Sequence, residues 1–158
     1  MSKVNKLSPS PLIIGLGDDY YGDDAIGLVL IRKLKEDRPL GKKVICLEIG
    51  KKSFQIIDHL DAHQKILIID AVRMGLDPGE FRIFKFSDVK PKIEKEILSF
   101  HQFGLAENLL LADWLGNDLS RVFIFGIEPE KLETGQGLSK EVEDKIDKYV
   151  RSIISWIR

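Results

Sequence analysis

Cysteine is almost absent from the sequence, and no apolar run is long. The one cysteine, Cys46, excludes an internal disulfide and any zinc or iron–sulfur site built from several cysteines. It stands in an apolar run, which predicts a buried and unreactive thiol. No apolar stretch approaches the roughly 20 residues that span a bilayer, and the polar segment from Met1 to Ser10 lacks a signal-peptide core. We therefore expect a cytoplasmic protein with no membrane association.

An excess of charge of either sign is also lacking. Lys and Arg together number 24 and Asp and Glu together 25, which leaves a formal net charge of −1. This balance gives no electrostatic reason to expect a nucleic-acid partner. With 44% hydrophobic residues, the chain of 158 residues is long enough to bury a core. Residues 1–158 are expected to form a single domain, with residues 1–10 as a flexible N-terminal tail.

Familiar hydrolase motifs are missing too. The sequence contains neither the Gly-x-Ser-x-Gly turn of a serine hydrolase nor the His-Glu-x-x-His helix of a zinc protease. An enzyme with this sequence would use a metal, carboxylates or the substrate itself for its chemistry. His59 and His63 are spaced four residues apart, so they form either a metal-binding pair or, as the favoured interpretation, a polar helix terminus.

Strand-like and helix-like segments alternate along the chain, without repeats, low-complexity segments or linkers. Strands are predicted at Leu12–Leu16, Lys43–Glu48, Lys65–Ile69, Glu80–Phe86 and Arg121–Ile127. Helices are predicted at Asp24–Glu36, Ser53–Leu60, Ser99–Leu115 and Ser139–Ile157. This alternation predicts an α/β fold, a three-layer α/β/α sandwich around a mostly parallel twisted sheet of about five strands.

Local details of these segments can be predicted as well. The alternation within Glu80–Phe86 is imperfect, which indicates a strand that is apolar on both faces or one with a bulge near Ile83. Residues 87–97 are charged and weakly patterned, so a surface loop is expected there. Ser99 and Gln102 are spaced as a capping box at the start of the long helix.

The most informative segment is the turn from Gly15 to Gly27, which follows the first predicted strand. A dinucleotide-binding fold places its phosphate loop at this position, so a nucleotide-binding protein is one alternative. The acidic residues of the turn are Asp18, Asp19, Asp23 and Asp24. These carboxylates would repel a phosphate, because a phosphate site needs free backbone N–H groups and a positive potential. The turn therefore favours a cation.

Parallel strands end at a common edge of a sheet, where ligands of such folds bind. Asp24 follows the first strand, Asp70 ends the central one and His101 opens the long helix. Two carboxylates and an imidazole suit a borderline transition ion such as nickel or zinc. The positive end of the helix would keep His101 neutral and able to donate a lone pair. Each residue alone also has an ordinary explanation, as a helix-terminal charge, a turn residue or a surface side chain.

Several segments, taken in order, resemble the hydrogenase maturation endopeptidases. They are Gly15-Leu16-Gly17-x5-Asp23-Asp24-Ala25-Ile26-Gly27, Ile69-Asp70-Ala71-x2-Met74-Gly75-x-Asp77-Pro78-Gly79-Glu80, Ser99-Phe100-His101-Gln102-x-Gly104-Leu105, and Phe125-Gly126-Ile127-Glu128-Pro129 followed by Gly137-Leu138-Ser139. The resemblance runs from Ile13 to the last predicted helix. No single segment is specific, but their order and spacing together are.

This resemblance implies a protease that removes a C-terminal extension from the large subunit of a nickel–iron ([NiFe]) hydrogenase, after nickel has been loaded into the precursor. It also implies that the enzyme reads the nickel through Asp24, Asp70 and His101, the residues that the strand ends already single out. The nickel would arrive with the precursor, so a resident catalytic zinc is not required. We expect a monomer, since the protein must bind a larger partner.

The sequence departs from the family pattern in the first turn and after the second predicted strand. Asp18 stands where family members usually have asparagine, and Asp24 stands where they often have glutamate. Glu48-Ile49-Gly50 replaces an Asp-Gly-Gly-type turn, so Glu48 would take the role of that aspartate. Glu48 and Asp18 are the candidates for activating the attacking nucleophile. These departures leave open a non-cleaving nickel-checkpoint chaperone that docks the precursor.

Overall fold

The computed structural model describes residues 6–36, 40, 43–97, 104–135 and 137–158. In these residues a sheet of five strands has the order β2-β1-β3-β5-β4. The strands are β1 (Leu12–Leu16), β2 (Ile45–Gly50), β3 (Ile66–Ala71), β4 (Phe81–Lys85) and β5 (Val122–Ile127). Four of them run parallel, and β4 pairs antiparallel with β5 at the edge of the sheet. The predicted mostly parallel sheet is confirmed.

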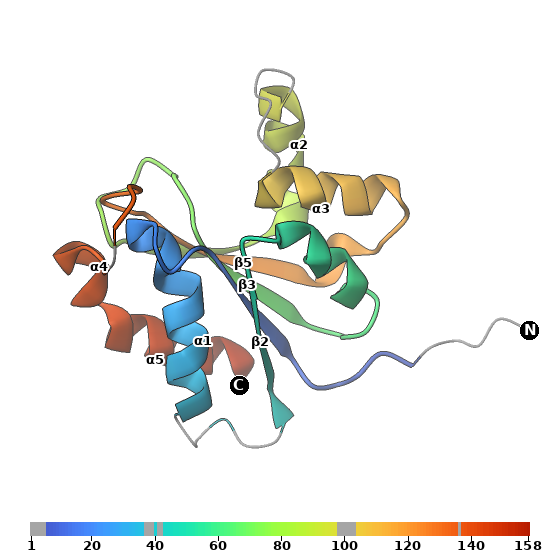
Figure 1. The fold of residues 1–158 in the computed structure, drawn as a ribbon. Coiled ribbons are helices and arrows are strands. Elements are labelled where there is room, and N and C mark those ends of the chain that lie inside the picture. The colour runs from blue at the N-terminus through green and yellow to red at the C-terminus, as the bar shows by residue number, and fades with distance from the viewer. Residues whose placement is uncertain (1–5, 37–39, 41–42, 98–103, 136) are drawn as a thin grey trace, which may run out of the picture.

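Helices cover both faces of this sheet (Figure 1). On one face lie α1 (Ile26–Glu36), α4 (Lys140–Glu143) and α5 (Ile146–Ile157). On the other lie α2 (Phe86–Ile97), α3 (Leu105–Trp114) and the 3-10 helix η3 (Ser53–His59). Short 3-10 turns, η1 (Gly22–Ala25) and η4 (Leu119–Arg121), precede α1 and β5. The α/β/α sandwich is confirmed, and within the described ranges no helix is long and apolar enough to cross a membrane.

The central strands are apolar runs because both of their faces are buried. Successive side chains of a strand point to opposite faces of the sheet. Ile13 and Leu67 accordingly pack beneath α1 and α5, whereas Ile14 and Ile68 pack beneath η3 and α3. Burying one such side chain contributes about 1.5–3 kcal/mol. This burial is the reason that the strands are recognisable in the sequence.

The edge strand β4 is apolar on both faces and has no bulge. Phe81 stacks on Phe125 of β5 with the ring centroids 4.8 Å apart, and Phe84 packs against the apolar cluster on the opposite face. The β4–β5 register advances one residue at a time from Phe81 to Lys85. Of the two expectations for this segment, the strand that is apolar on both faces is the correct one.

The predicted surface loop at residues 87–97 is wrong, because these residues belong to α2. Phe86 is fully buried, and Val89 packs against the same apolar cluster. Lys90 pairs with Asp113 of α3. Apolar residues do recur every three or four positions here, but the dense charge and Pro91, which is unfavourable inside a helix, obscure that period.

The helix predicted from Ser99 to Leu115 starts later than expected. Gly104 has an extended backbone, and α3 begins at the next residue, Leu105. The Glu107 carboxylate accepts the Gly104 N–H at 2.8 Å, so the capping interaction lies at this point. Residues 98–103, which include His101 and the predicted capping pair, lie outside the described residues. The expectation that His101 opens this helix therefore stays a prediction.

Other element ends differ by smaller amounts. β2 spans Ile45–Gly50 instead of Lys43–Glu48, and the helix predicted from Asp24 opens with the 3-10 turn η1. The predicted closing helix is interrupted by a turn between α4 and α5. Hydrogen bonding fades gradually at element ends, so a sequence pattern locates an element better than its boundary.

Ser8 and Cys46 can be placed in this fold. Ser8 donates its backbone N–H to the Ala62 carbonyl at 2.9 Å and accepts the Gln64 N–H at 3.0 Å. The single domain with a flexible tail at residues 1–10 stays a prediction. Cys46 is only partly buried. Burial nevertheless raises the pKa of its thiol, which favours the unreactive protonated form that the sequence predicts.

Candidate functional site

The carboxyl ends of β1 and β3 carry the acidic residues of the candidate site. Asp24 lies in η1, just after β1, and Asp70 lies near the end of β3. Gly17, with φ +127°, turns the chain between β1 and η1, and a Cβ atom there would lie 1.7 Å from the carbonyl oxygen of Asp24. Only glycine permits this close approach, which folds η1 back against the end of the strand.

Asp24 and Asp70 form an electrostatically coupled pair of carboxyl groups. Burial, followed by the negative charge of Asp24, raises the pKa of Asp70 to about 7. Burial also raises the pKa of Asp24. Ionisation of the pair is thus opposed by desolvation and by mutual repulsion. A bound cation offsets both effects, so this arrangement favours a positively charged ligand.

The third predicted ligand, His101, lies outside the described residues. In the part of the chain that the structure does describe, no group of three or more His, Cys, Asp or Glu side chains is arranged to hold a metal ion. Asp24 and Asp70 lie at the same edge of the sheet, and the charge of Asp24 contributes to the raised pKa of Asp70. The complete set stays a prediction.

The competing histidine pair has a structural explanation. His63 is buried, and its Nδ1 lies 3.0 Å from the Ser10 carbonyl oxygen, to which it donates a hydrogen bond. His59 is the last residue of η3. These positions support the interpretation of His59 and His63 as a polar helix terminus.

Asp18, one of the two candidate bases, lies in the segment between β1 and α1, residues 17–25, which we call the first loop. Other groups already bind its carboxylate. Its carboxylate accepts the Tyr20 N–H at 2.9 Å and lies 3.0 Å from the Lys51 ammonium group. The hydrogen bond from Tyr20 and the contact with Lys51 lower the pKa of Asp18. A lowered pKa makes this carboxylate a weaker proton acceptor for an attacking water.

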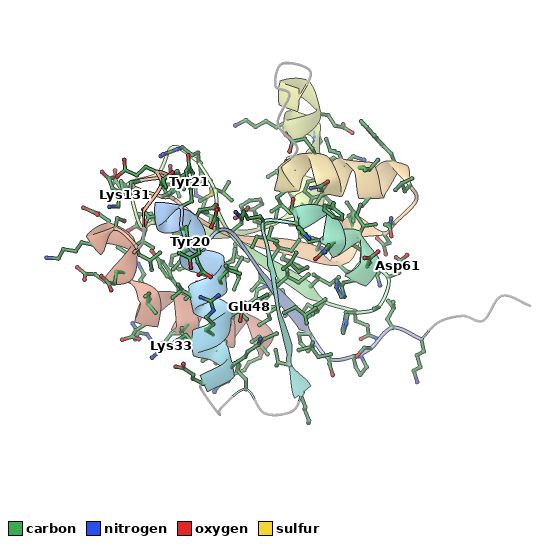
Figure 2. All side chains as sticks on the ribbon, viewed as in Figure 1. Tyr20, Tyr21, Lys33, Glu48, Asp61 and Lys131 are labelled. Atoms are coloured by element: carbon green, nitrogen blue, oxygen red, sulfur yellow. The ribbon has the colours of Figure 1, made fainter. Side chains whose placement is uncertain are left out.

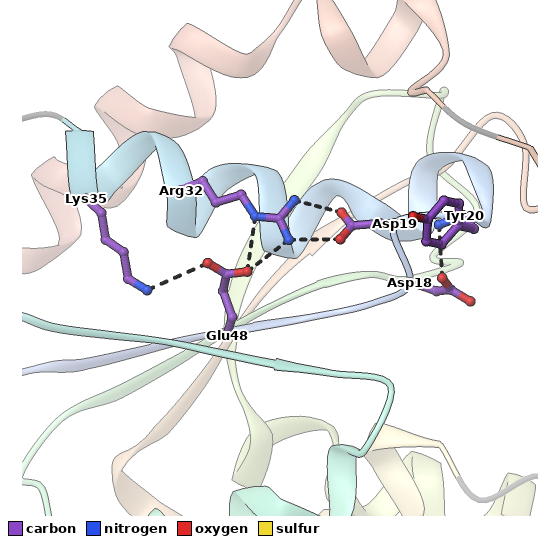
Figure 3. A network of polar contacts seen from close by, with 6 residues as sticks. All are labelled: Asp18, Asp19, Tyr20, Arg32, Lys35 and Glu48. Carbon is purple, nitrogen blue, oxygen red and sulfur yellow. Dashed lines mark hydrogen bonds and ion pairs between the residues drawn. The ribbon is translucent and has the colours of Figure 1, made fainter.

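Figure 3 shows a network that joins the first loop to α1 and β2. Arg32 of α1 donates to both carboxylate oxygens of Asp19 at 2.8 Å, and its Nε donates to Glu48 at 3.1 Å. Lys35 lies 3.7 Å from the other oxygen of Glu48. The hydrogen bond from Arg32 lowers the pKa of Asp19, and Asp19 in turn raises the pKa of Arg32. Glu48, the second candidate base, is thus paired with two cationic side chains.

Glu48 faces the opposite side of the sheet from Asp70. Residues two apart on a strand share a face. Cys46 packs with the cluster beneath α1, so Glu48, two residues on, points to the α1 face of the sheet. Ile68 packs with the cluster beneath α3, so Asp70 points to the α3 face. Asp70 lines a pocket of about 290 Å³ together with residues of β4, β5 and the start of α3. The proposed catalytic role of Glu48 stays a prediction.

Two buried carboxylates that the sequence did not single out, Asp23 and Glu128, hold the loops at this edge. Asp23 accepts hydrogen bonds from the segment after β5. Glu128 accepts backbone N–H groups from the loop after β3. In the sequence, Asp23 is only one acid among several in the first turn. The available signal is the position of Glu128, directly after a fully apolar strand.

Backbone donors of the first loop are engaged inside the protein. Hydrogen bonds to protein acceptors are made by the backbone N–H groups of Gly17, Tyr20, Gly22, Asp23 and Asp24. A phosphate needs such groups free. Together with the acidic side chains, these bonds weigh against the nucleotide-binding alternative.

Comparison with known proteins decides the family. Residues 28–156 match the model of the hydrogenase maturation protease family. The chain belongs to this family. The protease is 30% identical to the hydrogenase expression/formation protein HoxM of Cupriavidus necator over 148 residues, which cover 90% of this chain and 73% of HoxM. It is 32% identical to protein FrxA of Pyrococcus furiosus over 139 residues, which cover 87% of this chain and 97% of FrxA.

Solved structures of endopeptidases share the fold of this protease. The hydrogenase-maturating endopeptidase HybD from E. coli matches with a TM-score of 0.79 and 26% identity, covering 94% of this chain and 92% of HybD. The [NiFe] hydrogenase maturation protease HybD from Thermococcus kodakarensis matches with a TM-score of 0.70 and 28% identity, covering 94% of this chain and 99% of that one. The predictions of the family, of an endopeptidase and of the α/β sandwich are confirmed.

Proposed function

We propose that this protease removes the C-terminal extension of a [NiFe]-hydrogenase large-subunit precursor after the precursor has received nickel. Membership of the hydrogenase maturation protease family supports the choice of substrate. The observation that carries the nickel part is the coupled pair of Asp24 and Asp70 at the sheet edge. The nickel belongs to the precursor, so the protease recognises it as part of its substrate.

In this proposal, Asp24 and Asp70 bind the nickel of the precursor and His101 completes the set as a neutral imidazole. A cation favours the ionised form of Asp70, which has a pKa of about 7 and so releases its proton near neutral pH. Holding the metal fixes the scissile bond of the precursor beside these side chains. The metal polarises the carbonyl of that bond for attack by a water or an adjacent carboxylate.

The direct test uses the purified protease and a recombinant precursor that carries its C-terminal extension, with and without nickel. We expect cleavage of the nickel-loaded precursor alone, read as a mass shift on a gel and assigned by mass spectrometry. Asp24→Asn and His101→Ala should each slow cleavage by at least about 100-fold. Loss of a residue that only hydrogen-bonds to a metal ligand can already cost roughly that factor. Asp24→Glu should retain cleavage, because glutamate keeps the carboxylate. Normal cleavage by His101→Ala would remove that residue from the site.

A specific outcome of the same experiment assigns the alternative function. The departures at Asp18 and Glu48 motivate a nickel-checkpoint chaperone that docks the precursor without cutting it. Co-elution of the protease with uncleaved, nickel-loaded precursor on size exclusion, with no product after prolonged incubation, would favour that function. The same column tests the further proposal that the protease alone is a monomer, and fractionation of cells tests its cytoplasmic location.

A further inference from the structure

Asp23, the residue before Asp24, is a buried carboxylate bonded to a distant part of the chain. Its side chain is 0% exposed. Its Oδ1 accepts the backbone N–H of Ser139 at 2.7 Å, and its Oδ2 accepts the Ser139 hydroxyl at 2.8 Å. Oδ2 also accepts the backbone N–H groups of Glu130 and Lys131, at 2.8 and 3.0 Å. Both oxygens are thus bound by residues 128–135 and 137–139, which we call the post-β5 segment.

Backbone hydrogen bonds fasten the first loop to this same segment. The Asp23 N–H donates to the Lys131 carbonyl at 3.0 Å, and the Gly22 N–H donates to the Gly135 carbonyl at 3.3 Å. Gly22 has φ +56°, and a Cβ atom there would lie 2.7 Å from the Lys131 carbonyl oxygen, so the contact requires glycine. Figure 2 shows Tyr20, Tyr21 and Lys131 at the same end of the molecule. The first loop and the post-β5 segment form one hydrogen-bonded unit.

The loop after β3 is tied to the post-β5 segment as well. Glu128 is 4% exposed, and its Oε2 accepts the backbone N–H groups of Met74 and Leu76 at 2.6 and 3.2 Å. This loop begins after Ala71, the last residue of β3 and the neighbour of Asp70. The post-β5 segment therefore holds both of the loops that adjoin the Asp24–Asp70 pair.

We propose that Asp23 is a positioning residue, which fixes Asp24 relative to Asp70 so that both carboxylates face the same cation. A buried carboxylate is tolerated only when hydrogen-bond donors surround it. The donors to Asp23 described above all come from the post-β5 segment. Because both of its oxygens are held, Asp23 locks the 3-10 turn in which Asp24 lies. The inference rests on the proposed function, since Asp24 must contact the nickel of the precursor.

The test compares three variants in the precursor-cleavage assay. Asp23→Ala removes all bonds of the carboxylate, Asp23→Asn turns an amide N–H₂ group toward a backbone donor, and Ser139→Ala removes only the hydroxyl donor. Because displacing a reacting group by 1 Å can cost about 100-fold, we expect kcat to fall by about that factor in Asp23→Ala. We expect a smaller fall in Asp23→Asn. Ser139→Ala should keep the wild-type kcat, because the three backbone donors to Asp23 remain. Since Asp24 also contacts the nickel of the precursor, the KM for the nickel-loaded precursor should rise in Asp23→Ala and stay unchanged in Ser139→Ala.

Ile153→Ala is the matched control for lost stability. Ile153 is fully buried in α5, in the cluster that packs beneath α1, and it makes no part of the site. Each variant is assayed at the same interval below its own melting temperature, and Ile153→Ala should then keep the wild-type kcat. If Asp23→Ala and Ile153→Ala have the same kcat, Asp23 serves folding alone and the positioning role is overturned.

The outcomes also separate this inference from the proposed function. Failure of the wild-type protease to cleave any nickel-loaded precursor overturns the proposed function. Cleavage by the wild type, loss of cleavage in Asp24→Asn and undiminished cleavage in Asp23→Ala overturn the positioning role alone. Should Asp23→Ala lack a cooperative melting transition, Asp23→Asn decides, and a wild-type kcat in this variant overturns the positioning role.

Discussion

Arg32 binds Asp19 through both terminal nitrogens of its guanidinium group, each 2.8 Å from a carboxylate oxygen. This bidentate pair connects α1 with the loop that leads to Asp24, and the same guanidinium reaches Glu48 on β2. The side chains of Arg32 and Asp19 are 45% and 40% exposed, so water screens the pair. The contact therefore adds little energy, but its two parallel hydrogen bonds, which we call the fork, fix the orientation of Asp19 relative to α1.

The first prediction concerns this fork. Arg32→Lys should lower the free energy of unfolding by less than about 1 kcal/mol, because lysine cannot bind both oxygens and the pair is exposed. Urea denaturation at low salt and at about 1 M NaCl measures the effect, which should shrink at high salt. Arg151→Lys, on an exposed position of α5, is the control and should change little. A large loss in the free energy of unfolding that is the same at low and high salt would contradict this, because it would show that the pair behaves as a buried one.

Gly17→Ala should be far more destabilising than Gly116→Ala. Both glycines have positive φ values, +127° and +92°, so alanine carries a backbone strain of about 1–2 kcal/mol at either position. At Gly17 the added Cβ would also lie 1.7 Å from the carbonyl oxygen of Asp24, whereas at Gly116 no atom lies within 4 Å. Urea denaturation of the two variants gives the comparison. Equal losses of stability would mean that the approach of η1 to Gly17 is not what requires glycine.

Asp70→Asn should gain stability over the wild type as the pH rises from 5 to 8. Burial raises the pKa of Asp70 in the folded state to about 7, above its ordinary value of 3.8. Between these values the folded state binds more protons than the unfolded state, so wild-type stability falls as the pH rises. Asparagine does not ionise and escapes this loss, which is on the order of a few kcal/mol.

The measurement is urea denaturation of both proteins at several pH values. Asp118→Asn is the matched control, because the contacts of Asp118 with Ser120 lower its pKa. Asp118 is therefore ionised in both states throughout this range, and its substitution should have the same effect at pH 5 and at pH 8. A difference between Asp70→Asn and the wild type that does not vary with pH would contradict the raised pKa.

Glu128→Ala and Glu128→Gln should differ in stability. A single carboxylate oxygen of Glu128 accepts both the Met74 and the Leu76 N–H groups. Glutamine retains one such oxygen, whereas alanine leaves two partly buried donors without an acceptor, at up to about 1–3 kcal/mol each. Thermal or urea unfolding of the two variants measures the difference. Similar losses would indicate that the negative charge, and not the acceptor, holds this loop.

Much of the fold could be predicted from local patterns. β1 has the predicted bounds, Leu12–Leu16, because a strand buried on both faces is a short apolar run that few other elements imitate. The placement of Asp24 and Asp70 at one edge followed from the common direction of parallel strands. The α2 helix escaped prediction since Pro91 and the surrounding charges disguise its period. The start of α3 was misplaced because the capping glutamate, Glu107, lies five residues beyond the residue expected to cap, Gln102.

The amino-acid sequence by itself indicates which segments become strands, that the sheet is mostly parallel and which family the protein resembles, because burial and short motifs act over a few neighbouring residues. Folding alone sets which distant groups meet. Asp23 is separated by 107 residues from Glu130 and by 116 from Ser139, and no periodicity links them. Folding likewise brings the negative charge of Asp24 near Asp70, where it raises the pKa of Asp70. It also places Glu48 and Asp70 on opposite faces of the sheet. Electrostatic and hydrogen-bond energies depend on separation in space, which local sequence patterns do not encode.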